Sequence, residues 1–415
     1  MSSWHPCRLP TSSRSGCWGA RAPSRPTATA PQPEREFPVA YLDHNATSPL
    51  RPEGRAAMER ALEIAGNPSS IHAAGRAARG ALDRARAQVS ALVGAPAGQV
   101  IFTGGGTEAN ALALRGAVEG AAASGERITR LFVSAIEHDS VLATAQALAE
   151  QTPGLRLQSV HVDKNGVADV ATIRAMLREG KGRALIALMA ANNETGVVQP
   201  VADAAALARE SGALLFVDAV QAFGKSAMDF TADYISLSAH KIGGPQGVGA
   251  LIVNDAAPLA PQMLGGGQEH GLRAGTQNVA GIAGFGAVAA ACVPLDSTLR
   301  DRFEEELKRI VPGVTIFGED AARLPNTSNF ALPHIAAETS LIALDLDGVM
   351  VSSGAACSSG KVKPSHVLEA MGVSDDLAGC ALRVSFGWNS TQADVDAAIA
   401  ALRRLVARAP AREAA

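Results

Sequence analysis

The fold is decided by the stretch Asp233-Tyr234-Ile235-Ser236-Leu237-Ser238-Ala239-His240-Lys241-Ile242-Gly243-Gly244-Pro245. Its short apolar run, broken by two glycines and a proline, predicts a β-strand that ends on Lys241. In α/β proteins the carboxyl edges of strands carry the groups that handle ligands. A lysine amine can form a Schiff base there, whereas an arginine stays charged and cannot. Lys241 is therefore a candidate Schiff-base lysine, and a solvated lysine in a glycine-rich turn is the alternative.

Around this stretch, strands and helices alternate along the chain. The pattern predicts strands at residues 100–102, 131–134, 155–161, 184–189 and 214–217, and helices at 52–65, 76–93, 140–151, 167–178 and 201–210. Such alternation predicts an α/β fold with a mainly parallel sheet sandwiched by helices. From about residue 295 a charged helix, short strands near 314–317, 327–332, 349–352 and 382–386, and a final helix at 393–407 predict a smaller α+β domain.

We therefore predict three parts: a disordered N-terminal extension at residues 1–37, a large domain at 38–292 whose first segment packs on the small domain, and a small C-terminal domain at 293–409. The first 33 residues contain four arginines, no acid and many Ser, Pro and Ala residues, a composition that does not fold by itself. An organellar transit peptide is the alternative, although the prolines disfavour the amphipathic helix that such peptides use.

The bulk composition excludes several classes of protein. A net charge of −3, without a cluster of basic and aromatic residues, gives no basis for nucleic-acid binding. The longest uncharged apolar run, at residues 279–293, is shorter than the roughly 20 residues of a membrane-spanning helix and predicts a buried, close-packed helix. Five cysteines form no CxxC pair and no Cys/His metal spacing, so neither a metal site nor a disulfide framework is predicted. A reducing compartment, the cytoplasm, is expected.

Several other residues predict a cofactor site together with Lys241. The turn Gly104-Gly105-Gly106-Thr107 opens a helix, so its unpaired N–H groups and a hydroxyl can cradle a phosphate. Asp218 follows another strand and could keep a pyridine nitrogen protonated, while Gln221 could reach a ring hydroxyl. This set fits pyridoxal 5′-phosphate. Lys225, which lies after a strand end rather than at it, is the rival Schiff-base lysine.

The motifs of the chain, taken together, resemble one family. They are Leu42-Asp43-x-x-Ala46-Thr47, Gly66-Asn67-Pro68-Ser69-Ser70, Gly106-Thr107-Glu108-Ala109-Asn110, Glu137-His138, Asn192-Asn193-Glu194-x-Gly196, Val217-Asp218-x-x-Gln221, Ser238-x-His240-Lys241, Arg273-Ala274-Gly275-Thr276 and Ser353-Gly354-x-Ala356-Cys357. In this order they resemble the cysteine desulfurases of the NifS/IscS group, in the class V aminotransferases of pyridoxal-phosphate fold type I. That fold implies a large domain with a mainly parallel seven-stranded sheet. The resemblance spans about residues 39–405.

The resemblance implies a role for each matching residue. Lys241 would carry the cofactor and move protons, and His138 would stack on its ring as an acid or base. Asp218 and Gln221 would address the ring nitrogen and hydroxyl. Arg383 and Asn193 would take the substrate carboxylate, which suits the planar fork of an arginine. The phosphate would be held by Gly106, Thr107, Ser238, His240 and, from the partner subunit of a homodimer, Thr276.

The implied activity is that of a transferase. Cys357, on a loop of small residues that we expect to be exposed and mobile, would take the sulfur of L-cysteine as a persulfide and leave L-alanine. The sulfur would pass to an acceptor protein, such as a scaffold for iron–sulfur cluster assembly, and Cys357 could contact that cluster during transfer although no resident metal is expected. Nucleic-acid and membrane partners are not expected.

The alternatives are a selenocysteine lyase or an aminotransferase for small amino acids on the same fold, and a non-catalytic sulfur-carrier scaffold. The chain departs from the family's commonest pattern at His270, Gln246 and Trp388, which affects contacts between subunits or with the acceptor rather than the reaction. On their own, His138 could simply cap a helix, Arg383 could be an outward strand charge, and Asn193 could cap a turn.

Overall fold

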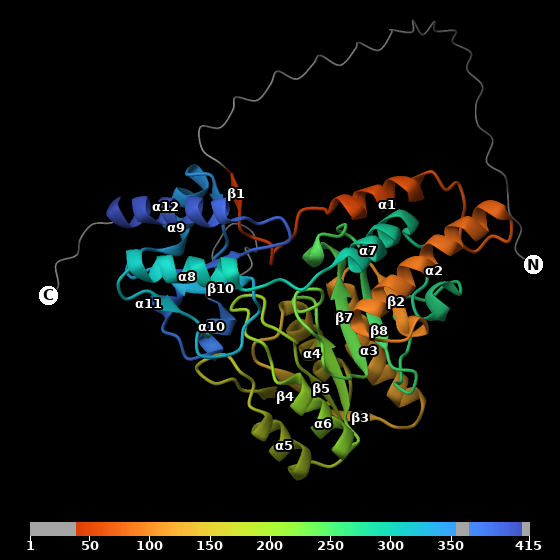
Figure 1. Cartoon of the computed structure of the whole chain (residues 1–415). Helices are drawn as coiled ribbons and strands as arrows, with labels where there is room; N and C mark the ends of the chain where they lie inside the picture. Colours follow the sequence, from red (N-terminus) through yellow and green to blue (C-terminus); the bar gives the residue numbers. More distant parts are fainter. Residues whose placement is uncertain (1–38, 354–364, 409–415) are drawn as a thin grey trace, which may run out of the picture. The chain divides into compact units, whose positions relative to one another are not determined.

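Seven strands, most of them apolar, build one sheet in the computed structural model, which describes residues 39–353 and 365–408 (Figure 1). The strand order is β2-β8-β7-β6-β5-β3-β4. The strands from β4 across to β7 pair in parallel, and β8 is antiparallel to both of its neighbours. The predicted, mainly parallel seven-stranded sheet is therefore confirmed. The bounds are β2 Val100–Thr103, β3 Ile128–Ser134, β4 Arg156–Val160, β5 Arg183–Ala187, β6 Leu214–Asp218, β7 Tyr234–Ser238 and β8 Gly249–Val253.

Helices cover both faces of this sheet. Alternate residues of a strand point to opposite faces, so Leu215 and Val217 enter one apolar core while Leu214 and Phe216 enter the other. The first core also contains side chains of α2, α5, α6 and α7, and the second contains those of α3 and α4. Helix α1 packs on α7. The bounds are α1 Pro52–Leu62, α2 Ala73–Val93, α3 Gly106–Ala123, α4 Asp139–Gln151, α5 Val170–Glu179, α6 Val201–Ser211 and α7 Val279–Ala291.

A second group of elements forms its own apolar core around Phe303, Phe330 and Leu402. It contains the antiparallel sheet β12-β10-β9 and the two-stranded pair β1-β11, in which the start of the described chain lies parallel to a strand more than 300 residues later. The division at residues 292 and 293 stays a prediction. The bounds are β1 Ala40–Tyr41, α8 Thr298–Ile310, β9 Thr315–Ile316, β10 Thr327–Ala331, α9 Ala337–Leu346, β11 Val349–Met350, α10 His366–Ala370, α11 Asp375–Ala378, β12 Ala381–Ser385 and α12 Gln392–Arg408.

The position of Lys241 differs from the prediction. Strand β7 ends at Ser238, and Lys241 lies three residues later in a short 3₁₀ helix, η2 (Ala239–Ile242). The chain leaves the sheet because Gly243, with φ +84°, closes this helix in a left-handed conformation and donates its N–H to the carbonyl of Ala239. The lysine is thus presented by a tight turn beyond the sheet edge.

Two predictions lie outside the described residues: the disordered extension at 1–37 and the loop that contains Cys357. Within the described ranges, no helix combines the length and apolarity needed to cross a membrane.

Candidate active site

A cavity of about 590 Å³ lies at the carboxyl edge of the sheet. It is lined by residues that follow β3, β5, β6 and β7, by the start of α3, and by Arg383 of β12. As the sequence predicts, the strand edge therefore brings together side chains that are far apart along the chain. The predicted site residues that line this cavity are Gly106, Thr107, His138, Asn193, Asp218, Gln221, Ser238, His240, Lys241 and Arg383.

Of the other two predicted site residues, the structure describes only Thr276. It is exposed and does not line the cavity of its own chain. Cys357 is outside the described residues, although Val351, Ser352 and Ser353, which precede it closely in the sequence, line the cavity.

The amine of Lys241 enters the cavity from η2. Its Nζ donates hydrogen bonds to the backbone carbonyl oxygens of Asn45, at 2.6 Å, and Ala46, at 3.0 Å. Burial, followed by the positive charge of Arg383, lowers the pKa of this amine to about 8, against the opposing effects of Asp43 and Asp218. At pH 7 about a tenth of the amine is therefore unprotonated, and this form is the nucleophile.

The start of α3 forms an anion-binding corner of the cavity. Gly105 precedes the helix with φ +152°, a conformation that favours glycine, and a Cβ on Gly106 would lie 2.9 Å from Val220 Cγ2. The first N–H groups of this 18-residue helix have no intrahelical partner, and Gly106 and Thr107, which carry two of them, line the cavity. This corner fits a phosphate.

His240 lies at the same corner and is uncharged at neutral pH. Burial, and then Lys241 and Lys225, lower its pKa to about 4. Its Nδ1 is 3.2 Å from Thr47 Oγ1. If Nδ1 accepts the hydroxyl proton, the opposite nitrogen carries the ring proton and can donate it to an anion in the cavity.

Asp218 carries the negative charge at the base of the cavity. Its two carboxylate oxygens accept hydrogen bonds from Asn110 Nδ2, at 2.8 Å, and from the backbone N–H of Val220, at 3.0 Å. The neighbouring Glu137 is fully buried, and burial together with the charge of Asp218 raises its pKa well above the usual value. Burial and the Asp218 carboxylate therefore favour the neutral form of Glu137.

His138 caps a helix and also lines the cavity. Its Nδ1 accepts the backbone N–H of Ser140 at the start of α4, so the ring does cap a helix. The ring also lines the cavity. Because Nδ1 is an acceptor, the neutral ring carries its proton on Nε2.

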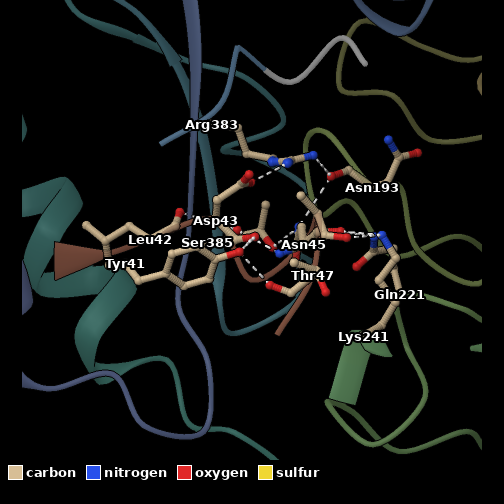
Figure 2. A network of polar contacts seen from close by, with 12 residues as sticks. Tyr41, Leu42, Asp43, Asn45, Thr47, Asn193, Gln221, Lys241, Arg383 and Ser385 are labelled. Carbon is tan, nitrogen blue, oxygen red and sulfur yellow. Dashed lines mark hydrogen bonds and ion pairs between the residues drawn. The ribbon is translucent and has the colours of Figure 1, made fainter. Parts of the chain in front are cut away.

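Arg383 is buried in the cavity wall rather than pointing outward, with 4% of its surface exposed. Its Nη2 pairs with Asp43 Oδ1 at 2.7 Å, and its Nη1 donates to the carbonyl oxygen of Asn193 at 2.9 Å (Figure 2). Its Nε has no hydrogen-bond partner among the described residues. The guanidinium therefore brings a positive charge to the cavity wall, where it can attract an anionic ligand.

The sequence analysis gave no role to Asn45, which lies at the centre of the polar network in Figure 2. Its side-chain oxygen accepts from Lys225 Nζ, at 2.9 Å, and its side-chain nitrogen donates to Thr327 Oγ1, at 2.9 Å. Its backbone oxygen accepts from both Gln221 and Lys241. The Leu42-Asp43-x-x-Ala46-Thr47 motif marked the segment but left this position unspecified.

The two lysines considered for the Schiff base occupy different places. Lys241 lines the main cavity, whereas Lys225 does not. Lys225 is 4% exposed and donates hydrogen bonds to Asn45 and Gln221.

Among the described residues, no cluster of three or more His, Cys, Asp or Glu side chains could hold a metal ion.

Two of the departures from the family pattern contact the segment that follows Ala46. Trp388 donates to the carbonyl of Pro49, at 2.9 Å, and the guanidinium of Arg51 lies 5.3 Å from the centre of its ring. Gln246 approaches Thr47 Oγ1 at 3.4 Å.

Comparisons with known proteins agree with one another. Residues 40–398 match the family model for aminotransferase class-V. The chain is 43% identical over 375 residues to a cysteine desulfurase from Cereibacter sphaeroides, with 88% of this chain and 95% of that protein covered. A solved NifS-like protein superposes with a TM-score of 0.81 and 31% identity, over 89% of this chain and 99% of that one. A solved structure of SspA in complex with cysteine gives a TM-score of 0.73 and 29% identity, over 84% and 98% of the two chains.

Proposed function

Since the chain belongs to the aminotransferase class-V family and is a cysteine desulfurase, we propose that its cavity holds pyridoxal 5′-phosphate on Lys241 and removes the sulfur of L-cysteine. The observation that carries this proposal is the meeting, in one cavity, of an amine of lowered pKa at Lys241, a carboxylate at Asp218 and an anion-binding helix start at Gly106. An amine, an acid and a phosphate cradle are what this cofactor needs from a protein.

The donors of the cavity fit the cofactor group by group. When bound, pyridoxal phosphate supplies an electron sink for the α-carbon of the substrate. The Asp218 carboxylate would keep the ring nitrogen protonated, and the Gln221 amide would donate to the ring hydroxyl. His138 would cover the ring face and exchange a proton through its Nε2. The phosphate would be held by Gly106, Thr107, Ser238 and His240.

Arg383 and Asn193 are proposed to bind the substrate carboxylate. The guanidinium is held rigidly by Asp43 and by the carbonyl of Asn193, while its Nε lacks a partner in the described structure. A pre-positioned guanidinium loses little entropy when it binds a carboxylate. This arrangement would orient cysteine with its sulfur toward the part of the wall formed by Ser352 and Ser353.

Cys357 is proposed to accept the sulfur. Its thiolate would attack the sulfur of cysteine, the new S–S bond forming as the Cβ–S bond of the substrate breaks. Cysteine and a thiol then become alanine and a persulfide, so the atoms balance without an external oxidant or reductant. The positive charge of Arg383 would favour the thiolate of a cysteine that enters the cavity.

A sulfur acceptor, a compartment and an oligomeric state are proposed together with this reaction. The persulfide would be passed to an acceptor protein, such as a scaffold for iron–sulfur cluster assembly, in a reducing compartment such as the cytoplasm. The chain would act as a homodimer in which Thr276 of one subunit reaches the phosphate bound by the other. Exposed apolar side chains support association, since Ile71 and Leu264 are 91% and 82% exposed.

The test is mass spectrometry of the protein after incubation with L-cysteine and pyridoxal phosphate. We expect one added sulfur atom on Cys357. The Cys357→Ala variant should lose alanine release by more than about a hundredfold and keep the visible absorbance of the bound cofactor. Cys380→Ala, which removes a half-buried thiol outside the cavity, is the matched control and should keep both. Full turnover by Cys357→Ala would show that the sulfur acceptor is another group.

A further inference from the structure

We propose that Lys225 is a positioning residue, which holds the Gln221 amide with an N–H group directed into the cavity. This inference rests on the function proposed above, because the acceptor for that N–H is the ring hydroxyl oxygen of pyridoxal phosphate. Lys225 is 4% exposed and does not line the main cavity, so it acts through Gln221 rather than on the cofactor directly.

The contacts of Lys225 are all buried. Its Nζ donates to Gln221 Oε1, at 2.8 Å, and to Asn45 Oδ1, at 2.9 Å. Both acceptors are neutral side-chain oxygens, and Lys225 lies four residues after Gln221 in the turns that follow β6. A buried amine so far from water is costly unless its donors are used, which indicates a specific role for these two hydrogen bonds.

The orientation of Asn45 is fixed independently of Lys225. Its Nδ2 donates to Thr327 Oγ1, at 2.9 Å, and to the carbonyl oxygen of Asn193, at 3.3 Å. A carbonyl oxygen can only accept, so the amide nitrogen of Asn45 must lie on that side and its Oδ1 must face Lys225. Lys225 is therefore the donor in this contact.

The Gln221 amide is held at both of its ends. Its Nε2 donates to the backbone oxygen of Asn45, at 3.0 Å, and its Oε1 accepts from Lys225. These two partners together define which end of the amide is nitrogen. An amide nitrogen carries two hydrogens, so one remains for an acceptor in the cavity that Gln221 lines.

The same backbone oxygen of Asn45 also accepts from Lys241 Nζ, at 2.6 Å (Figure 2). Lys225, Gln221, Asn45 and Lys241 therefore form one connected set of hydrogen bonds, in which Lys225 anchors the end remote from the cavity. Removing it would leave Gln221 Oε1 buried without a donor, and the amide would then rotate to find another partner. Charged and titratable groups that interact with Lys225 are Lys241, Arg383, Cys292, His44 and His240.

The consequence for the cofactor follows from the direction of the Gln221 N–H. A hydrogen bond donated to the ring oxygen favours its anionic form. Loss of that bond should raise the pH at which the visible chromophore of the bound cofactor loses its proton. It should also weaken pyridoxal phosphate binding by about threefold to tenfold, which corresponds to one hydrogen bond.

The experiment measures the pH midpoint of the visible absorbance, and the dissociation constant of pyridoxal phosphate, in Lys225→Met, Gln221→Leu and the double variant. Methionine keeps the length and apolar stem of lysine but has no donor. Both single variants should shift the midpoint upward, and the double variant should shift it no further than Gln221→Leu alone, because Lys225 acts through Gln221. Lys164→Met, at an exposed lysine outside the cavity, is the matched control and should shift nothing.

An unchanged midpoint in Lys225→Met, or shifts that add in the double variant, would overturn the proposal. If Lys225→Met does not fold, Lys225→Gln takes its place, because its shorter donor leaves Gln221 incompletely held and the same pattern is expected. The proposed function fails in a different way. The cofactor assignment is wrong if the wild-type protein gains no visible absorbance with pyridoxal phosphate, or if Lys241→Ala still gains it. A Lys225→Met variant that gains the absorbance with an unchanged pH midpoint overturns the positioning role alone.

Discussion

At the scale of single residues, the reactivity of Lys241 follows from its surroundings. Two backbone carbonyl oxygens hold its amine, while burial and the nearby guanidinium of Arg383 lower its pKa from 10.5 to about 8. The two acids of the cavity, Asp43 and Asp218, act in the opposite direction and are outweighed. The amine is therefore neutral often enough to attack an aldehyde near neutral pH, whereas an exposed lysine is almost fully protonated there.

We predict that the rate at which the cofactor-free protein gains visible absorbance with pyridoxal phosphate rises with pH through a midpoint of about 8. The unprotonated amine is the reactive form, so the rate should increase about fivefold between pH 7 and pH 8 and level off above pH 9. Stopped-flow absorbance at a series of pH values measures this dependence. Lys241→Arg should give no absorbance at any pH, and a midpoint near 10 in the wild-type protein would contradict the environment described for the amine.

Single residues also show where sequence reasoning reaches its limit. Asp218 and Gln221 could be predicted because they follow a strand, and the carboxyl ends of parallel strands meet at one edge. Asn45 could not be predicted, because its side chain bonds to Lys225 and Thr327, which are 180 and 282 residues away in the sequence. No local pattern records contacts of that separation. They become visible only when the pieces of the chain are assembled.

At the scale of elements, the start of α3 determines how the phosphate would be held. We predict that Gly106→Ala weakens pyridoxal phosphate binding at least about tenfold, since the added Cβ would lie 2.9 Å from Val220 Cγ2 and occupy the space beside the helix start. Equilibrium titration measures the effect. Pyridoxal, which lacks the phosphate, should bind equally well to the variant and to the wild-type protein.

The matched control for this variant is Gly98→Ala in the 3₁₀ helix η1 (Ala97–Gln99), where a Cβ would meet no atom within 4 Å. It should bind both compounds normally. An equal loss of affinity for pyridoxal and pyridoxal phosphate in Gly106→Ala would mean that the substitution disturbs the cavity as a whole rather than its phosphate corner.

The elements themselves were predictable where one face is clearly apolar. The helices expected at 140–151 and 393–407 match α4 and α12 to within a residue at each end. Helix α9 was missed because its apolar residues do not form one stripe, with Leu344 buried and Ile342 64% exposed. Strand β8 was missed because the other strands were predicted from the alternation of strands and helices. In contrast, β8 follows the glycine-rich turn and runs antiparallel between β2 and β7.

At the scale of the whole molecule, one cavity depends on segments from most of the chain. Asn45 near the beginning, Lys241 in the middle and Arg383 near the end meet in the network of Figure 2. In a single chain, the phosphate corner lacks one of the residues predicted to hold the phosphate, since Thr276 is exposed and does not line the cavity of its own subunit. The proposed homodimer supplies this residue from the second copy.

Subunit mixing tests that arrangement. Lys241→Ala and Thr276→Glu, in which a carboxylate would repel the phosphate, should each be nearly inactive alone. In a mixed dimer, the subunit that keeps Lys241 receives an intact Thr276 from its partner, so one complete cavity forms. Co-refolding equal amounts should therefore restore about a quarter of the wild-type alanine release, because half of the dimers are mixed and each has one complete cavity. If Thr276 acted within its own chain, both cavities of the mixed dimer would carry a defect. Alanine release would then stay at the level of the separate variants at every mixing ratio, and the homodimeric site would be refuted.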